Sequence, residues 1–205
     1  MKHVVVIDYG IGNVDSVCRA VSRCGAHGVV TDAPEAIMNA DGLILPGVGS
    51  FAEGMAQLEK RGLISVLKQK AQEEKAPFLG ICLGMHLMAS VGTEGGVAQG
   101  LDLIHGRVVK FSPDSNKIKI PHIGWNDVKW RRRDPILCDI PDHTDFYFVH
   151  SYHFQCDEAY IVGTSSYCCD FASVIAHGKC YGTQFHPEKS QRMGLRFLKN
   201  FIELC

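Results

Sequence analysis

The residue best suited to chemistry is a cysteine between two glycines. Cys82 is the centre of Gly80-Ile81-Cys82-Leu83-Gly84, which joins an apolar run to a helical pattern. Glycines around a nucleophile permit the sharp strand-to-helix turn that lifts its side chain above a sheet. At a helix start the dipole favours a thiolate, and the Leu83 N–H is free to stabilise an oxyanion. The motif predicts a nucleophile; a cysteine packed as a small apolar side chain is the alternative.

A histidine and a carboxylate two residues apart form the second cluster. His186 and Glu188 stand in Gln184-Phe185-His186-Pro187-Glu188-Lys189. At a strand end both side chains project the same way, so the carboxylate can orient the imidazole and stabilise its charged form. Pro187 fits such a strand terminus. The pair predicts a general base with its orienting group. The alternative is a surface His beside a surface Glu, which is what a single His-x-Glu sequence more commonly forms.

Two other kinds of site have weaker support. His150, His153 and His186 could be imagined as zinc ligands, but no Cys/His set has the spacing of a structural zinc site. The turn Gly10-Ile11-Gly12 lacks the third glycine of a dinucleotide fingerprint, since position 15 is an aspartate. We therefore expect no metal and no cofactor.

The elements that position these residues alternate in the first half of the chain. Continuous apolar runs predict strands at residues 3–8, 28–30, 42–45 and 78–81. Amphipathic patterns predict helices from residue 14, over 34–39, over 51–72 with a break near Gly62, and from 83 to 91. This alternation predicts a parallel sheet covered on both faces.

The second half has a different pattern, with strand signals and no long helices between them. The six candidate strands cover residues 107–111, 125–130, 146–150, 160–164, 171–176 and 180–185. A final amphipathic helix covers 191–204. We expect antiparallel or mixed strands here that complete or flank the sheet. The whole chain, residues 1–205, is expected to be a single α/β domain.

Composition limits the classes of function. The 205 residues are 46% hydrophobic, and 21 basic residues balance 22 acidic ones for a net charge of −1. A neutral chain has no electrostatic footprint for nucleic acid or an anionic membrane, and no apolar run approaches the roughly 18 residues of a membrane span. Nine cysteines without Cys-x-x-Cys pairs, and a start that leads into a strand instead of a signal peptide, indicate free thiols in a reducing cytoplasm.

Together, the cysteine motif and His186-Pro187-Glu188 resemble the class I, triad-type glutamine amidotransferases over essentially the whole chain. Further segments in the same order resemble the glutaminase subunits of imidazole glycerol phosphate synthases, which act in histidine biosynthesis: residues 8–13, 46–51, 121–126, 148–152 and 184–190. The resemblance implies a three-layer fold, with a central, mostly parallel sheet, helices on both faces and additional antiparallel strands in the C-terminal half.

The resemblance also implies a reaction. Cys82 attacks the side-chain amide of L-glutamine, His186 transfers the proton, Glu188 holds the imidazole, and water hydrolyses the glutamyl thioester to glutamate, leaving ammonia. The residues implied to bind the oxyanion and the substrate are Gly47, Val48, Gly49, Leu83, His86, Ser151 and Tyr152. His86 is a departure, because the family commonly has Gln there.

The family resemblance further implies a heterodimer. Its partner is a (β/α)8-barrel cyclase that receives ammonia through an internal channel and makes imidazole glycerol phosphate and an aminoimidazole carboxamide ribonucleotide. The candidate interface residues are Asn13, Trp125, Tyr147 and Lys189. Two alternatives stay open: a stand-alone cysteine hydrolase or an amidotransferase that feeds another acceptor, and a non-catalytic binding module that kept the fold.

Overall fold

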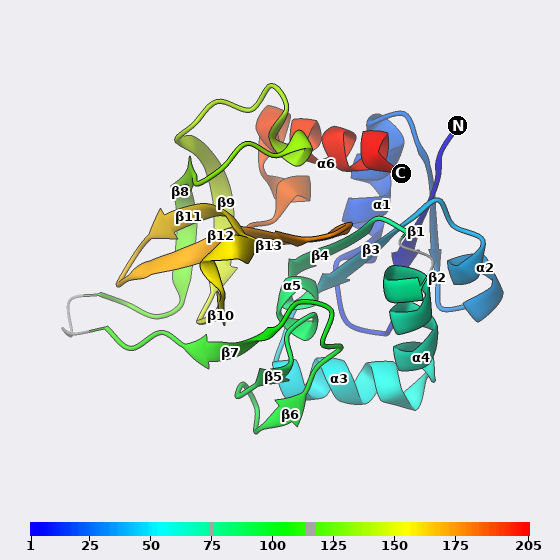
Figure 1. Ribbon diagram of the computed structural model, residues 1–205, viewed down its shortest axis with the longest axis horizontal. Helices are drawn as coiled ribbons and strands as arrows, with labels where there is room; N and C mark the ends of the chain where they lie inside the picture. The colour runs from blue at the N-terminus through cyan, green and yellow to red at the C-terminus, as the bar shows by residue number, and fades with distance from the viewer. Residues whose placement is uncertain (74–75, 114–117) are drawn as a thin grey trace.

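The computed structural model describes residues 1–73, 76–113 and 118–205. Within them the chain forms a nine-stranded central sheet and a smaller four-stranded sheet, with helices on both faces of the central one (Figure 1). The strands are β1 (His3–Ile7), β2 (His27–Thr31), β3 (Gly42–Gly47), β4 (Phe78–Cys82), β5 (Val91–Gly92), β6 (Ala98–Gln99), β7 (Gly106–Lys110), β8 (His122–Trp130), β9 (Thr144–His150), β10 (Tyr152–Cys156), β11 (Ile161–Ser166), β12 (Asp170–His177) and β13 (Cys180–Thr183).

The α-helices are α1 (Val14–Arg23), α2 (Pro34–Met38), α3 (Phe51–Lys60), α4 (Leu63–Lys68), α5 (Leu83–Leu87) and α6 (Gln191–Leu204). A π-helical turn (Gln69–Glu73) extends α4, and 3-10 turns cover Pro135–Leu137, Glu158–Tyr160 and Pro187–Lys189. None of the helices in the described ranges combines the length and the apolar character that crossing a bilayer requires.

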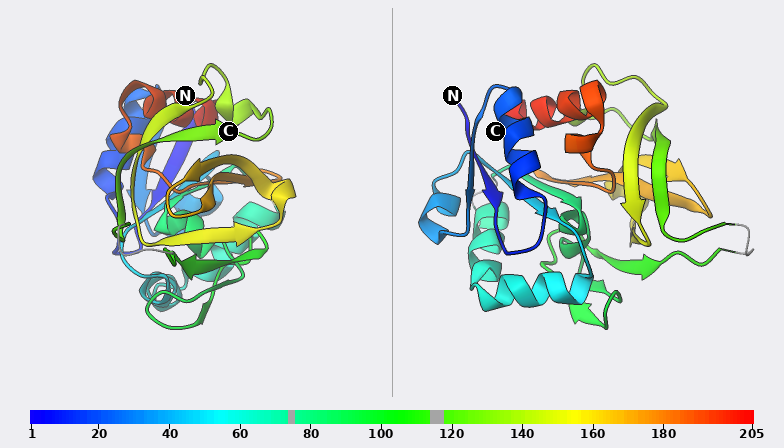
Figure 2. Two further views of the ribbon diagram at one scale, coloured as in Figure 1. Left: turned by 90° about the vertical axis from the view of Figure 1, so that its left-hand side faces the viewer. Right: turned by 180° about the vertical axis from the view of Figure 1, so that it is seen from behind.

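Both faces of the parallel strands β1, β3, β4 and β13 are buried, which explains their continuous apolar sequences, whereas β2 at the sheet edge is only partly buried. Side chains alternate along a strand, so Val4 and Val6 of β1 join the core under α1 and α6, while Val5 and Ile7 join the core under α2 to α5. Helices α1 and α6 lie side by side on one face, and α3, α4 and α5 cover the other (Figure 2). The three-layer α/β fold is therefore confirmed.

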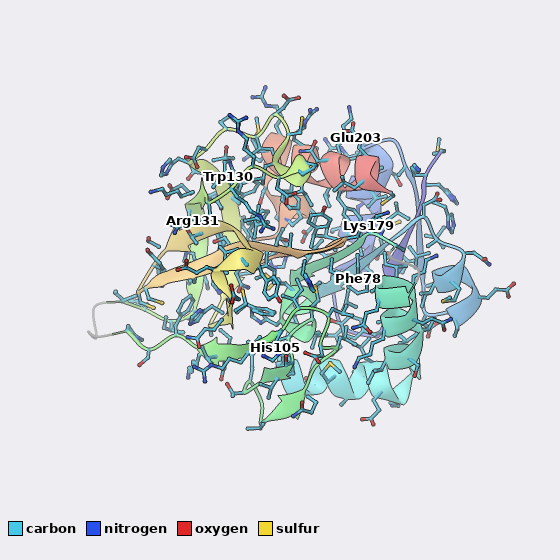
Figure 3. All side chains as sticks on the ribbon, viewed as in Figure 1. Phe78, His105, Trp130, Arg131, Lys179 and Glu203 are labelled. Atoms are coloured by element: carbon cyan, nitrogen blue, oxygen red, sulfur yellow. The ribbon has the colours of Figure 1, made fainter. Side chains whose placement is uncertain are left out.

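Side chains fill the space between the layers (Figure 3). Phe78, at the start of β4, is fully buried in the core on the α3–α5 side, whereas Glu203 is exposed on α6. The buried side chains form two core clusters, in which alternate residues of β1 take part.

The strand order brings distant parts of the chain together. It runs β2-β1-β3-β4-β13-β12-β11-β8-β9, with parallel pairs from β2 to β13 and antiparallel pairs beyond. On the two sides of β4, Gly47 pairs with Cys82 and Thr183 pairs with Ile81. The carboxyl ends of β3, β4 and β13 therefore meet at one edge, where α/β sheets commonly bind ligands.

The predicted helix from 83 to 91 is too long. Helix α5 ends at Leu87, and Val91 lies in β5 beside β7. The carbonyls that a longer helix would need are taken by a returning loop, since Leu101 donates to Leu87 O and Leu103 donates to Met88 O. A tertiary contact therefore ends the helix.

The strand geometry predicted for His186 and Glu188 is also wrong. β13 ends at Thr183, and Pro187–Lys189 is a 3-10 turn closed by hydrogen bonds such as Lys189 N to His186 O. Pro187 cannot donate to a strand ladder, which favours this turn. The short strands β5, β6 and β10 were not predicted, because their sequence patterns are brief and weakly alternating.

Candidate active site

Cys82 occupies a strained turn between β4 and α5. Its backbone has φ 54° and ψ −109°, a positive-φ conformation outside the left-handed helical region that is uncommon for a residue with a side chain. Both flanking glycines are required, because a methyl group on Gly84 would overlap the Leu45 carbonyl and one on Gly80 would lie 2.6 Å from Met85 N. The turn that the motif predicts is therefore present, with the sulfur at the end of β4.

His186 and Glu188 form a buried pair beside this turn. The Nδ1 atom of His186 donates to Oε1 of Glu188 over 2.9 Å, and the two side chains are only 3% and 1% exposed. This bond leaves Nε2 as the ring nitrogen available to Cys82, and Nε2 has no hydrogen-bond partner among the described residues. Burial opposes the charged imidazole, but the Cys82 thiolate and Glu188 outweigh it and raise the pKa of His186 to about 10.

A cavity of about 290 Å³ opens above Cys82 and His186. Six of the seven residues expected at the oxyanion and substrate sites line it: Val48, Gly49, Leu83, His86, Ser151 and Tyr152. Gly47 lies beneath, paired with Cys82 across β3 and β4. Three distant loops thus converge on the sulfur.

His86 forms part of the cavity wall as a neutral ring. It is buried, and its Nε2 lies 2.8 Å from Oε1 of Gln184. Burial lowers the pKa of His86 to about 4, although the bond to Gln184 works against this shift. At neutral pH His86 therefore supplies hydrogen-bonding groups and no charge.

A chain of hydrogen bonds that the sequence did not predict supports residues 151–152. Asn126 Nδ2 lies 3.3 Å from His122 Nε2, His122 Nδ1 lies 2.9 Å from His150 Nε2, and His150 Nδ1 donates to the Tyr152 carbonyl over 2.8 Å. Since that carbonyl accepts, each neutral ring has one consistent tautomer. Burial lowers the pKa of His122 to about 4 and that of His150 well below its usual value.

The imagined zinc site does not assemble in the described part of the chain. There, no group of three or more His, Cys, Asp or Glu side chains is placed to hold a metal ion. His150 instead bonds to His122, and His153 stacks on Phe111 with ring centroids 4.7 Å apart.

Two further residues of the cavity were not among the expected site residues. The Val149 carbonyl lies 3.8 Å from Cys82 Sγ, and Glu94 lines the cavity from the loop between β5 and β6. Burial raises the pKa of Glu94, while a hydrogen bond from the Phe51 N–H opposes that shift. Glu94 follows a two-residue strand without recognisable periodicity, so only the fold reveals that it faces Cys82.

Three of the four predicted interface residues form a cluster. The rings of Trp125 and Tyr147 lie 6.2 Å apart, and the Lys189 Nζ lies 5.9 Å from the Tyr147 ring. Trp125 is 49% exposed and Lys189 is also exposed. Asn13 directly precedes α1, which packs against the 187–189 turn.

Comparison with known proteins identifies the family. Residues 5–204 match the model of the family "Glutamine amidotransferase class-I". The chain is 47% identical to imidazole glycerol phosphate synthase subunit HisH of Moorella thermoacetica, over 100% of this chain and 96% of that protein. It is 44% identical to subunit HisH 1 of Campylobacter jejuni strain 81-176, over 98% and 100%.

Solved structures share the fold at low sequence identity. A putative GMP synthase protein from Thermoplasma acidophilum superposes with a TM-score of 0.76 at 22% identity, covering 100% of this chain and 94% of that one. PurLQS from Thermotoga maritima gives 0.74 at 16% identity, covering 100% and 97%. Taken with the sequence matches, these likenesses show that the chain belongs to the class I glutamine amidotransferases, in the group of imidazole glycerol phosphate synthase HisH subunits.

Proposed function

We propose that the chain hydrolyses L-glutamine to glutamate and ammonia with Cys82 as nucleophile. The thiolate attacks the side-chain amide carbon, and the His186 imidazolium gives its Nε2 proton to the departing ammonia. Water then attacks the glutamyl thioester, its proton passes to His186, and Cys82 is released as thiolate. Glu188 keeps Nε2 directed at the reacting atoms. The observation that carries the proposal is the convergence of sulfur, imidazole and buried carboxylate at the cavity floor.

The oxyanion of the tetrahedral intermediate needs hydrogen-bond donors. Leu83 is the first residue of α5, directly after Cys82. Gly47 pairs with Cys82 between β3 and β4, and Val48 and Gly49 line the cavity. Both can offer backbone N–H groups to an oxygen bound above Cys82. Removing one such donor typically costs about 3 to 4 kcal/mol of barrier.

The cavity lining offers partners for the two charged groups on the α carbon of glutamine, the ammonium and the carboxylate. Glu94 offers a carboxylate to the α-ammonium group, while backbone groups at Ser151 and Tyr152 offer neutral hydrogen bonds. His86 supplies one further polar contact without charge. A small, partly polar cavity of about 290 Å³ suits one amino acid better than a peptide.

We further propose that the ammonia passes to a (β/α)8-barrel cyclase bound as a heterodimer, since free ammonia would be lost to water and protonation. The product of the complex is imidazole glycerol phosphate with an aminoimidazole carboxamide ribonucleotide. The names of the HisH relatives support this partner. The cluster of Trp125, Tyr147 and Lys189 is the proposed contact, together with Asn13, which directly precedes α1.

We also propose that the protein is a single cytoplasmic domain that binds neither nucleic acid nor membrane, which the nine cysteines without Cys-x-x-Cys pairs and the net charge of −1 support.

The test measures glutamate release from glutamine with and without the cyclase. We expect native protein to be active with the cyclase, Cys82→Ala to be inactive, and Cys180→Ala, which alters another buried cysteine, to stay active. High activity without the cyclase would favour a stand-alone hydrolase. No activity under any condition would favour a binding module.

A further inference from the structure

A buried tyrosine hydroxyl lies against the loop that faces Cys82. Tyr9 follows β1 and is 0% exposed, and its hydroxyl has no hydrogen-bond partner among the described residues. The hydroxyl touches Gly47, because a methyl group built at Gly47 would overlap it. Buried polar groups are nearly always paired, so an unpaired phenol beside catalytic machinery calls for an explanation.

The hydroxyl lies on the interior side of the loop. The cavity side of Gly47-Val48-Gly49 is formed by Val48 and Gly49, whereas Tyr9 belongs to the core on the α3–α5 side. The first turn of the chain packs on the same loop, since Gly12 faces the Pro46 carbonyl. Tyr9 is therefore placed to contact the loop backbone from behind.

The phenol is a permanent donor. Burial raises the pKa of Tyr9 far above its usual value, and the negative charge of Cys82 raises it further. The hydroxyl thus keeps its proton at any working pH. The Tyr9 hydroxyl is therefore a hydrogen-bond donor without an acceptor among the described residues.

We propose that Tyr9 is a positioning residue that stabilises the oxyanion-binding state of the loop. When the Gly47–Val48 peptide turns its N–H towards the cavity, its carbonyl oxygen turns inward and accepts the Tyr9 hydrogen bond. Gly47 permits this rotation because it has no side chain, and any side chain would also displace the hydroxyl. The inference rests on the proposed glutaminase reaction, whose oxyanion this N–H would bind.

The test is Tyr9→Phe, which removes only the hydroxyl, assayed in complex with the cyclase. We expect kcat for glutamate release to fall about tenfold, as for the loss of one hydrogen bond, with KM within about twofold. The melting temperature should not fall, because the hydroxyl is unpaired without substrate. Tyr181→Phe, at a buried tyrosine on β13 away from the loop, is the matched control and should keep the native kcat.

Alkylation of Cys82 by iodoacetamide separates this role from an effect on the sulfur. Alkylation forms no oxyanion, so its rate should be the same in Tyr9→Phe and native protein. A changed alkylation rate would show that the hydroxyl acts on the thiolate and would overturn the proposal. So would a kcat within twofold of native.

A second measurement follows the backbone of the Gly47-Val48-Gly49 loop by NMR. In a Cys82→Ala complex, saturating glutamine should shift the Val48 amide NMR signal, and adding Tyr9→Phe should remove most of that shift. If the single variant melts well below native and the Val48 shift persists, Tyr9 has only a structural role. If native protein with cyclase releases no glutamate, the proposed function fails, whatever Tyr9 does.

Discussion

The imidazole of His186 donates its Nδ1 hydrogen to Glu188 Oε1 over 2.9 Å, and both side chains are almost completely buried. The two residues flank Pro187, where His186 directly precedes the 3-10 turn and Glu188 lies within it, a few residues after β13 has paired with β4. This bond fixes the ring and leaves Nε2 as the nitrogen available to Cys82, which lines the same cavity.

The bond between His186 and Glu188 predicts that the pKa of His186 depends on the charge of Glu188. Glu188→Gln keeps the size of the side chain but removes its charge, so burial of the imidazolium is less compensated. We expect the pKa of His186, measured by NMR, to fall below about 10, and glutamate release to fall about 10²- to 10⁴-fold. Cys82→Ala should lower this pKa too. An unchanged pKa in both variants would contradict the assigned cause.

The turn at Cys82 predicts unequal effects of two glycine substitutions. In Gly84→Ala the new methyl meets the Leu45 backbone carbonyl, which cannot move without distorting β3, so we expect a loss of more than about 3 kcal/mol of unfolding free energy. In Gly54→Ala on α3, the methyl meets side-chain methyls, those of Leu87 at 3.0 and 3.1 Å and one of Leu83 at 3.4 Å. That change should stay within about 1.5 kcal/mol. Urea unfolding of both proteins provides the comparison; equal losses would contradict it.

Buried histidines predict loss of stability in acid. The pKa of His86 and of His122 is lowered to about 4 in the fold, so between pH 6.5 and 4 the unfolded chain binds more protons. Stability should therefore fall as pH falls through this window, by about 1.4 kcal/mol for each unit of pKa shift. His122→Asn, which keeps a donor near the Nδ1 position, should flatten the dependence. Urea midpoints from about pH 7.5 to about 4.5 measure it, and a slope identical to native would refute the role of His122.

The exposed cluster predicts where the partner acts. Lys189→Ala removes a cation 5.9 Å from the Tyr147 ring, so stimulation of glutamate release by the cyclase should fall about two- to fivefold at fixed cyclase concentration. The melting temperature should not change. Lys199→Ala, at another exposed lysine on α6, is the control and should keep the native stimulation. The same ratio in both variants would exclude Lys189 from the interface.

Short-range features of this protein could be read from its sequence. The β1 run, the break at Gly62 and the Gly80-to-Gly84 turn follow from side-chain periodicity and backbone sterics over a few residues. The types of residue needed for nucleophile, base and orienting carboxylate were equally visible. Local physics was sufficient for these features because each involves neighbours along the chain.

The positions of those groups relative to one another depended on the tertiary structure. β13 lies beside β4 although about a hundred residues separate them, and that register brings His186 to Cys82. The end of α5 at Leu87, the placement of Glu94 in the cavity, the His122–His150 bond and the contact of Tyr9 with Gly47 are decided in the same way. Each depends on hydrogen bonds and packing between segments far apart in sequence, whose pairing leaves no periodic trace in either segment. The sequence by itself therefore determined which groups could do the chemistry, and the sheet register decided which of them meet.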